Sequence, residues 1–358
     1  MSDPNTLRIL ELDGGGERGY LSLSFFQKFV QLWGIDPTTL YSQFDVICGT
    51  SIGGIMALGL AFGLTPAQIM PFFTVQGPYI FSLTSLTPSV RPNLAAKIAL
   101  ITADIPFYQS SGPTAAQYGY GLLQATLQSI FGSNTLQNLK TNVLIPSYQY
   151  DNKTYVMFSN LNYPDFIGQN ELISNVALAT SSAPIYFPAL NLNNHVYIDG
   201  GVYNNNPAEL GRTLAQIIKP TAVRTCILSL GTGLGELGFD PGNPSMIDPR
   251  IDPKLMMTLK SLQNNNVKLF DSIATIFSLF NIAAVGSQES TAKALYLESQ
   301  YTLNQLYYYR FQPKLDLSLD TELDNTDPAI LTYYQNTANQ WYNNDIENIT
   351  NFIGHLTA

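Results

Sequence analysis

The chain has 358 residues, 45% of them hydrophobic, and 17 Lys and Arg against 26 Asp and Glu give a formal net charge of −9. This acidic balance argues against a nucleic acid polymer as partner, because phosphate binding needs clustered basic side chains that displace counterions. At about 150 residues per domain the length allows two domains or one large α/β unit, and the hydrophobic content is ample for either.

The N-terminal residues MSDPNTLRILELDGGG contain no basic segment followed by an apolar one, as a secretory signal would. The longest apolar stretch, residues 52–73, is interrupted from Gly63 onward by glycine, proline and polar residues, and so falls short of the ~20 apolar residues of a membrane span. Cys48 and Cys226 lie in short apolar runs, where buried free thiols are expected rather than a disulfide. We therefore expect a soluble, cytoplasmic protein.

Short β-rich runs alternate with helical patterns along the chain. The expected strands are Leu7–Leu12, Asp45–Cys48, Thr154–Ser159, His195–Ile198 and Thr225–Leu230. The expected helices are Leu21–Trp33, Ile52–Leu64 and Asn175–Leu178, the last ending at a turn over Ser181–Pro184. Strands separated by helices are typical of βαβ units, so the pattern predicts an α/β fold with a mainly parallel sheet.

No repeat, linker or charge run marks a domain boundary, so we expect a single domain over residues 1–358. Its core is expected at about 5–235, with a helical portion at about 250–358 packed on it, because Ile273, Ile276, Phe277 and Phe280 have helical spacing. Residues 71–113 are rich in Pro, Ser, Thr and aromatics, which predicts an irregular cap beside a site.

The first motif, Asp13–Gly19 (DGGGERG), lies between an expected strand and an expected helix. Consecutive glycines there expose backbone N–H groups, and the helix dipole adds positive potential, so the loop suits a phosphate or a developing oxyanion. Gly14, Gly16 and Gly19 also fit the dinucleotide fingerprint, but the acidic residue expected ~20 positions later is Asp36, inside a turn. A lone glycine loop is more often a tight turn than a ligand site, so this motif alone leaves its use open.

The second motif, Gly49-Thr50-Ser51-Ile52-Gly53, also lies between a strand and a helix, which is the context of a nucleophile elbow. Gly49 and Gly53 leave room for a strained turn that lifts the Ser51 hydroxyl to the start of the helix, where N–H groups favour an alkoxide. A close-packed helix start is the alternative interpretation, since G-x-S-x-G also occurs by chance.

Two kinds of residue compete as the base that activates Ser51. A Ser-His-Asp triad needs a histidine, and the sequence has only His195 and His355, the latter near the C-terminal end. His195 lies four residues before Asp199, on the order of 13 Å along a strand, so the two cannot easily reach one serine. Asp199 is followed by Gly200 and a second glycine that open space beside it, so we favour a Ser51–Asp199 dyad over a triad. An Asx turn is the alternative role for Asp199.

Taken together, these segments resemble the patatin-like lipid acyl hydrolases. D-G-G-G-x-R-G, G-x-S-x-G and D-G-G stand in the family's order at Asp13–Gly19, Gly49–Gly53 and Asp199–Gly201. Further segments that resemble plant patatins are FDVICGTSIGG, MPFFTVQGPYIF, ATSSAPIYFP, GGVYNNNP and LSLGTG. The resemblance spans most of the chain and is weakest over residues 82–134 and after residue 237. It implies a three-layer α/β/α fold related to the α/β-hydrolase architecture.

The resemblance also implies the roles of the site residues. Ser51 would be the nucleophile, Asp199 the base, and the oxyanion hole would be formed by Gly14, Gly15 and Gly16. Supporting positions would be Arg18, Thr50, Gly49, Gly53 and Gly200. Arg18 would steady the loop or meet a lipid phosphate, and a structural salt bridge is an equally good interpretation.

The implied reaction is hydrolysis of fatty acyl esters through an acyl-enzyme, of phospholipase A type with lysophospholipase or galactolipase activity as extensions. No metal or other cofactor is implied, and calcium is not expected. The implied partners are a phospholipid or other acyl lipid and, transiently, a membrane surface met through local apolar contact, because the net charge is −9.

Two other functions stay open at this point, a triad-type serine esterase that uses His195 and a non-catalytic nucleotide-binding module that uses the glycine loop. Some bacterial relatives are toxins delivered to host cells, and others are defence effectors switched on by a cyclic nucleotide. The sequence shows neither a delivery signal nor a recognisable sensor domain, so delivery to a host and an activator are both left open.

Overall fold

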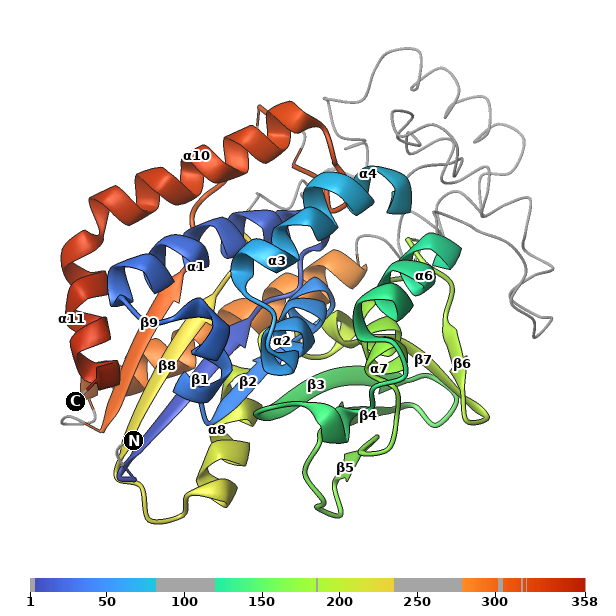
Figure 1. Ribbon diagram of the computed structural model, residues 1–358, viewed down its shortest axis with the longest axis horizontal. Coiled ribbons are helices and arrows are strands. Elements are labelled where there is room, and N and C mark those ends of the chain that lie inside the picture. The colour runs from blue at the N-terminus through green and yellow to red at the C-terminus, as the bar shows by residue number, and fades with distance from the viewer. Residues whose placement is uncertain are drawn as a thin grey trace.

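The computed structural model describes residues 4–81, 120–184, 186–234, 279–301, 305–316, 318–319 and 321–357. At its centre lies a sheet with the strand order β5-β4-β3-β2-β1-β8-β9, in which β7 pairs with β3 and β6 with β7 (Figure 1). The strands are β1 (Thr6–Leu12), β2 (Val46–Gly49), β3 (Asn142–Gln149), β4 (Thr154–Phe158), β5 (Phe166–Ile167), β6 (Leu190–Leu192), β7 (His195–Asp199), β8 (Arg224–Leu230) and β9 (Leu306–Phe311). The pairs β1–β2, β2–β3, β1–β8 and β8–β9 are parallel, whereas β4 and β7 run antiparallel to β3. The predicted mainly parallel sheet is therefore confirmed.

Helices cover both faces of this sheet. They are α1 (Gly19–Trp33), α2 (Ile52–Phe62), α3 (Pro66–Pro71), α4 (Gly77–Ile80), α6 (Tyr120–Phe131), α7 (Ile173–Ser181), α8 (Ala208–Ile218), α10 (Pro328–Asn344) and α11 (Ile346–Thr357), and residues 279–301 are also helical. One apolar core joins the sheet to α1, α2, α7, α10 and α11, and a second joins its other face to α8 and to Leu295 (Figure 1). The arrangement has the three layers α/β/α that were expected.

Burial on both faces explains why the central strands are easy to recognise in the sequence. All seven residues of β1 are buried, since a parallel strand between two helical layers meets apolar neighbours on either side. On one face the ring of Phe25 in α1 stacks on Phe311 of β9, with 4.2 Å between ring centroids. The carboxyl end of β1, from which the glycine loop continues, is thus held inside a rigid core.

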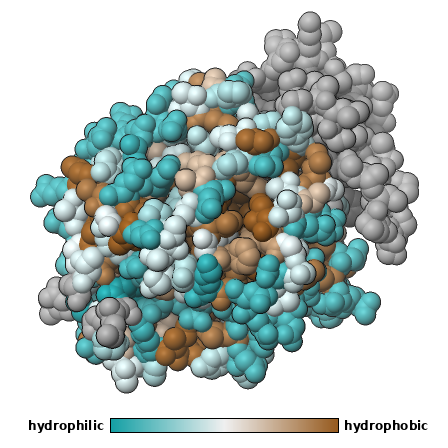
Figure 2. All heavy atoms as spheres, in the orientation of Figure 1, coloured by the Kyte–Doolittle hydropathy of each residue, from teal (hydrophilic) through white to brown (hydrophobic). Residues whose placement is uncertain are grey.

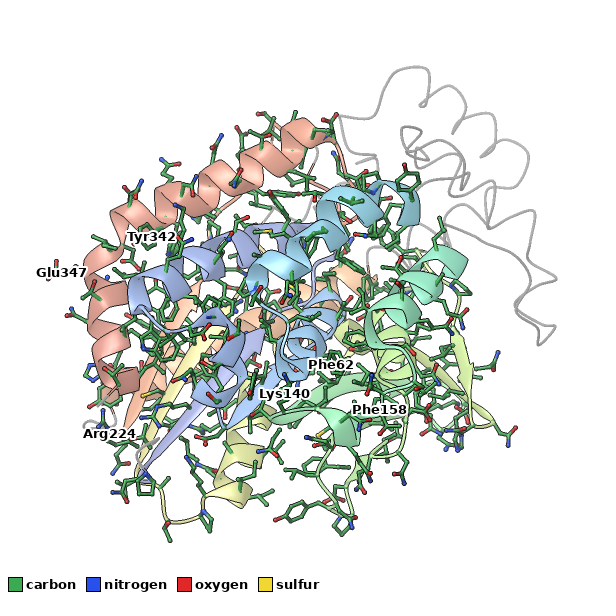
Figure 3. All side chains as sticks on the ribbon, viewed as in Figure 1. Phe62, Lys140, Phe158, Arg224, Tyr342 and Glu347 are labelled. Atoms are coloured by element: carbon green, nitrogen blue, oxygen red, sulfur yellow. The ribbon has the colours of Figure 1, made fainter. Side chains whose placement is uncertain are left out.

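The first helical layer continues outward to α6. Phe62, at the end of α2, packs edge to face on Phe131 of α6 with 5.6 Å between the ring centroids (Figure 3). Hydrophobic side chains gather between α2 and α6 on this face, within a largely hydrophilic surface (Figure 2). Phe81, at the end of α4, packs in turn on Phe187, which follows α7. These contacts fix the relative positions of the helices whose residues form the walls of the pocket described below.

Four strands, β3, β5, β6 and β9, were not expected from the sequence. β3 contains Pro146, which weakened the strand pattern because proline cannot donate to a ladder. β9 lies in the C-terminal third, where helical spacing was expected, and its sequence LYYYRF, with three half-buried positions, has neither a fully apolar run nor clean alternation. Ile273, Ile276 and Phe277 lie outside the described residues, whereas Phe280 is helical.

Other expectations have clear outcomes. Cys48 and Cys226 are buried and free. Of the predicted irregular cap, residues 72–76 form a π-helix followed by α4, and residues 82–113 lie outside the described part of the chain. Within the part that the structure describes, no helix has the length and apolarity to cross a membrane.

Candidate active site

Ser51 lies at the sharp turn from β2 into α2. Its backbone has φ 57° and ψ −126°, a conformation that non-glycine residues rarely adopt and that a nucleophile elbow requires. A Cβ on Gly49 would lie 2.4 Å from the Gly53 carbonyl oxygen, and one on Gly53 would lie 2.1 Å from the Leu12 carbonyl oxygen. The Ser51 N–H donates to Oγ1 of Thr180 at 3.0 Å. The turn is therefore possible because Gly49 and Gly53 have no side chain, which lets the ends of β1 and β2 and the start of α2 pack closely.

Asp199 ends β7 and is fully buried. Its Oδ1 accepts the N–H of Gly201 at 2.6 Å, and a Cβ on Gly200 would lie only 2.5 Å from the Pro146 carbonyl oxygen. Burial raises the pKa of Asp199 to about 7, against the opposing effects of the Ser51 hydroxyl and the Gly201 N–H. Oδ2 makes no hydrogen bond of good geometry to the described residues. The structure thus places beside Ser51 a carboxylate that exchanges its proton near neutral pH.

The glycine loop faces the same site. The Gly14 N–H donates to the carbonyl oxygen of Asn205 at 3.2 Å, and the Gly14 carbonyl accepts Oγ1–H of Thr232 at 2.9 Å. The N–H groups of Gly15 and Gly16 have no acceptor within the described part of the chain. Of the three predicted donors, Gly14 is therefore engaged with Asn205, and Gly15 and Gly16 hold the open N–H groups.

A pocket joins these groups to an apolar wall. It is lined by Ser51, Asp199 and the glycine loop. Apolar lining residues include Ile55, Phe72, Phe81, Leu123, Phe187 and Phe280. A site with a few polar groups at one end of an apolar cleft suits a ligand that has one reactive polar group on a long hydrocarbon.

Known protein families and proteins resemble this chain. The family model for patatin-like phospholipase matches residues 10–211, more than half of the chain. The chain belongs to the patatin-like phospholipase family. The matched range contains Asp13–Gly19, Gly49–Gly53 and Asp199–Gly201.

Named relatives of this chain come from bacteria and plants. A cGAMP-activated phospholipase of Vibrio cholerae is 34% identical over 217 residues, covering 58% of this chain and 57% of the relative. Patatin-like protein 2 of Arabidopsis thaliana is 31% identical over 260 residues, covering 64% and 60%. The chain thus matches less than two thirds of the length of these relatives. Among solved structures, VipD from Legionella pneumophila has a TM-score of 0.44 at 11% identity, covering 96% of this chain and 68% of that one.

Two supporting residues of the patatin-like site have distinct surroundings. Arg18 is half-buried and lines the pocket; burial lowers its pKa, while nearby groups, Tyr334 first among them, act the other way. Thr50 is buried, and its Oγ1 donates to the carbonyl oxygen of Asn204 at 2.7 Å. Arg18 therefore faces the ligand space, and Thr50 ties the elbow to the segment that follows Asp199.

The two histidines lie elsewhere. Nδ1 of His195 is 2.9 Å from Oδ2 of Asp151 and 2.7 Å from Nε2 of Gln149, and its side chain is 42% exposed. His355 stacks on Tyr307 with 3.7 Å between ring centroids. Neither histidine lines the pocket with Ser51. Neither histidine is therefore placed to act with Ser51 in a catalytic triad.

A nucleotide-binding role of the glycine loop would require Asp36 to lie at the pocket, and it does not. Asp36 accepts the N–H of Thr38 at 2.9 Å in an exposed turn and does not line the pocket. Across the described residues, no three side chains among His, Cys, Asp and Glu come together as metal ligands would. The residues that line the pocket with the loop include Ser51 and Asp199.

Sequence reasoning missed several residues that hold this patatin-like site together. Asn205, Thr180 and Thr232 bind the glycine loop or the elbow, and they lie in the segments GGVYNNNP, ATSSAP and LSLGTG. Those segments were recognised only as parts of the resemblance. A run of polar residues just after D-G-G was the available indication, and its targets depend on the fold.

Proposed function

We propose that this protein hydrolyses fatty acyl esters of membrane lipids, as a phospholipase of A type, by a Ser51–Asp199 dyad through an acyl-enzyme. The observation that carries the proposal is the strained Ser51 beside an Asp199 whose pKa is raised to about 7 by burial. A general base works best when its pKa lies near the working pH. The apolar pocket supports a long acyl chain as the bound group.

The steps follow from these positions. Asp199 takes the Ser51 proton as Oγ attacks the ester carbonyl, and the N–H groups of Gly15 and Gly16 receive the oxyanion. The proton passes from Asp199 to the leaving alcohol oxygen, which leaves an acyl ester on Ser51. Asp199 then deprotonates a water that attacks this ester, and the fatty acid departs as Ser51 regains its proton. Each oxyanion donor is worth roughly 10²–10³ in rate.

Substrate breadth follows from the same chemistry. The dyad acts on the acyl ester alone, so we infer that lysophospholipids and galactolipids carrying the same ester are also hydrolysed. Arg18 lines the pocket close to Ser51, where its charge suits a lipid phosphate. With a net charge of −9, contact with the membrane surface relies on apolar groups rather than on anionic lipids.

The test is fatty acid release from mixed phospholipid vesicles in the presence of EDTA. We expect release by the wild type, none by Ser51→Ala or Asp199→Asn, and full release by the control His195→Ala. Loss of activity in His195→Ala would favour a triad, and release by Ser51→Ala would overturn the proposal. Because relatives are named cGAMP-activated phospholipases, each assay includes an arm with cGAMP.

A second measurement tests whether Ser51 is the nucleophile independently of which lipid is the substrate. An alkyl fluorophosphonate labels an activated serine without any vesicle. We expect labelling of the wild type and none of Ser51→Ala. A wild type that is labelled but releases no fatty acid would retain the dyad and overturn the lipid substrate.

A further inference from the structure

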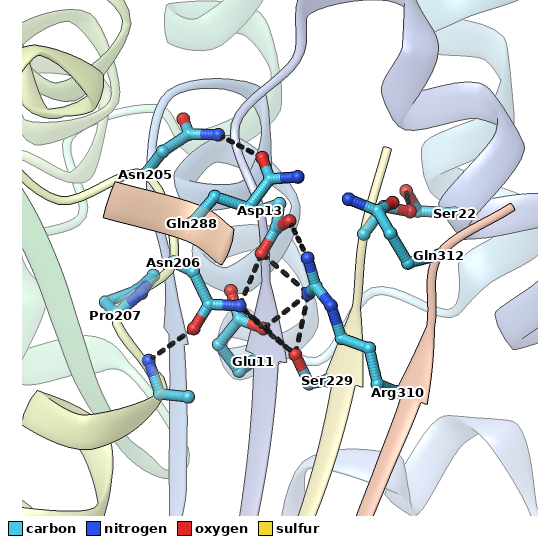
Figure 4. Close-up of polar contacts among 12 residues, drawn as sticks. Glu11, Asp13, Ser22, Asn205, Asn206, Pro207, Ser229, Gln288, Arg310 and Gln312 are labelled. Carbon is cyan, nitrogen blue, oxygen red and sulfur yellow. Dashed lines mark hydrogen bonds and ion pairs between the residues drawn. The ribbon is translucent and has the colours of Figure 1, made fainter. Parts of the chain in front are cut away.

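A buried polar cluster lies directly beneath the glycine loop (Figure 4). Nη1 and Nη2 of Arg310 donate to the two carboxylate oxygens of Asp13, at 2.9 and 2.5 Å, so the pair is bidentate. Nη1 of Arg310 also donates to Oγ of Ser229 at 2.8 Å, and Ser229 donates to Oε2 of Glu11 at 2.5 Å. Asp13 immediately precedes Gly14, so these hydrogen bonds hold the glycine loop at its first residue.

The sheet register brings these residues together. Glu11 of β1 is in register with Ser229 of β8, and Ser229 is in register with Arg310 of β9. Their side chains therefore share one face of three neighbouring parallel strands. Asp13 lies two residues beyond Glu11, at the carboxyl ends of the strands, where ligands bind in parallel sheets. The arginine reaches toward the site rather than away from it.

Asn206 grips the same carboxylate from the opposite side. Its Nδ2 donates to Oδ1 of Asp13 at 2.8 Å and lies 3.1 Å from Oε2 of Glu11. Asn206 belongs to the segment after Asp199, whose neighbouring residues bind Gly14 and Thr50. The Asp13 carboxylate is thus the junction at which β9, the glycine loop and the segment of the base meet.

Such a cluster is costly to bury, so stability alone does not account for it. Glu11 and Asp13 are fully buried, and the Arg310 side chain is only 12% exposed. Burial and the neighbouring Asp13 raise the pKa of Glu11 well above its ordinary value, so this side chain adds to the cost of the cluster. Replacing a buried ion pair by apolar residues is often neutral or stabilising. Its geometric precision, on the other hand, is what an apolar contact cannot supply.

We propose that Arg310 is a positioning residue for the oxyanion hole, acting through Asp13 to fix the N–H groups of Gly15 and Gly16 relative to Ser51. This inference rests on the proposed function. Arg310 lies outside residues 10–211, the part that the family model matches, so the C-terminal strand contributes to the geometry of the site.

The test compares Arg310→Gln, Arg310→Lys and the double variant Asp13→Asn/Arg310→Gln with the wild type on a soluble short-chain ester. The double variant removes both charges, so neither partner is left as an uncompensated buried ion. Arg212→Gln is the matched control, because Arg212 also pairs with two carboxylates, Glu209 and Glu298, but far from the pocket. The rate of labelling of Ser51 by an alkyl fluorophosphonate is measured on every variant.

We expect Arg310→Gln to lower kcat by roughly 10²-fold while KM stays within about twofold, because only the oxyanion is misplaced. Arg310→Lys keeps the charge without the bidentate geometry, and we expect an intermediate kcat. The double variant should regain thermal stability without regaining kcat, and its pH profile should keep the wild-type midpoint. Arg212→Gln should match the wild type in kcat.

Wild-type kcat in the double variant would overturn the inference, because the pair would then only neutralise charge. If Arg310→Gln does not fold, the Lys and double variants decide. If the wild type is active and every folded variant has the same kcat, the role of Arg310 is overturned and the proposed function stands. A wild type that neither hydrolyses the ester nor is labelled overturns the proposed function, and this inference with it.

Discussion

Thr180 connects Ser51, the proposed nucleophile, to the strand that supports Asp199, the proposed base. Its Oγ1 accepts the N–H of Ser51 at 3.0 Å and donates its own proton to the Pro146 carbonyl oxygen at 2.6 Å. Pro146 belongs to β3, whose next residue, Ser147, is in register with Asp199 of β7. One buried hydroxyl thereby sets the elbow against the sheet edge that carries Asp199.

Replacing Thr180 by Val should therefore loosen the elbow. The substitution keeps the shape but leaves the Ser51 N–H and the Pro146 carbonyl without a partner, which costs about 1–3 kcal/mol for each buried group left unsatisfied. We expect a lower melting temperature and a kcat reduced by about 10-fold to 100-fold, because small misplacements of a nucleophile are costly. Thr180→Ser retains the hydroxyl and should recover most of both, as thermal melts and ester hydrolysis would show. Equal kcat in Val and Ser variants would contradict this role.

Gly16 offers a test of the loop with a control elsewhere in the chain. It has φ +55°, and a Cβ would lie 2.1 Å from the Leu323 carbonyl oxygen, so Gly16→Ala must displace the loop. Gly34 has φ +72° with open space around it, at the end of α1. Both substitutions impose a left-handed residue, at about 1–2 kcal/mol. We expect Gly16→Ala to lose about 10²-fold or more in kcat and Gly34→Ala to keep full activity. Comparable kcat losses in the two variants would point to global destabilisation.

Much of the fold and the core of the site could be predicted because the relevant patterns are local. β1 and β2 are short apolar runs that end in glycine turns, and the residues that turn the chain at Ser51 lie within two positions of it. Motifs of this kind depend on backbone conformations that only certain residues adopt. The turn at Ser51 and the glycine loop could be recognised for that reason, whereas the pairing of Ser51 with Asp199 stays a prediction.

The rest depends on contacts between distant segments. Arg310 and Asp13 are 297 residues apart, and an arginine in a tyrosine-rich run gives no local indication of a buried ion pair. The same holds for the use of the Gly14 N–H, which the carbonyl oxygen of Asn205 takes only once the two loops meet. The resemblance predicts the glycine loop as an oxyanion hole, whereas the fold decides which of the loop N–H groups are open.

The pH dependence of hydrolysis should report the environment of Asp199. The carboxylate must be ionised to take the Ser51 proton, and burial raises its pKa to about 7. We therefore expect kcat/KM to rise with pH through about 7 and to level off above it, in a profile measured with a soluble ester. A midpoint near the ordinary value of 3.8 would mean that Asp199 is not the base. His195→Ala should leave the midpoint unchanged, since His195 binds Asp151 instead.

The same pKa predicts that the active protein is less stable than an inactive variant. The folded-state pKa of Asp199 lies above its unfolded value, so its contribution to stability is fully present below about pH 4 and is lost as pH rises through about 7. Moving a pKa from 3.8 to about 7 corresponds to roughly 4 kcal/mol at alkaline pH. Asp199→Asn carries no charge, and its side-chain oxygen still accepts the Gly201 N–H.

Asp199→Asn should therefore unfold at a higher temperature than the wild type at pH 8, with the difference shrinking toward pH 4. Denaturant unfolding at both pH values measures the gain, which we expect to be about 2 kcal/mol or more at pH 8, since part of the burial penalty is relieved by local opening. Asp151→Asn is the contrasting variant, because hydrogen bonds from His195 and Val196 lower the pKa of Asp151 to about 2. That variant should lose stability at pH 8, if only slightly at its exposed position. A wild type more stable than Asp199→Asn at pH 8 would contradict the raised pKa of Asp199.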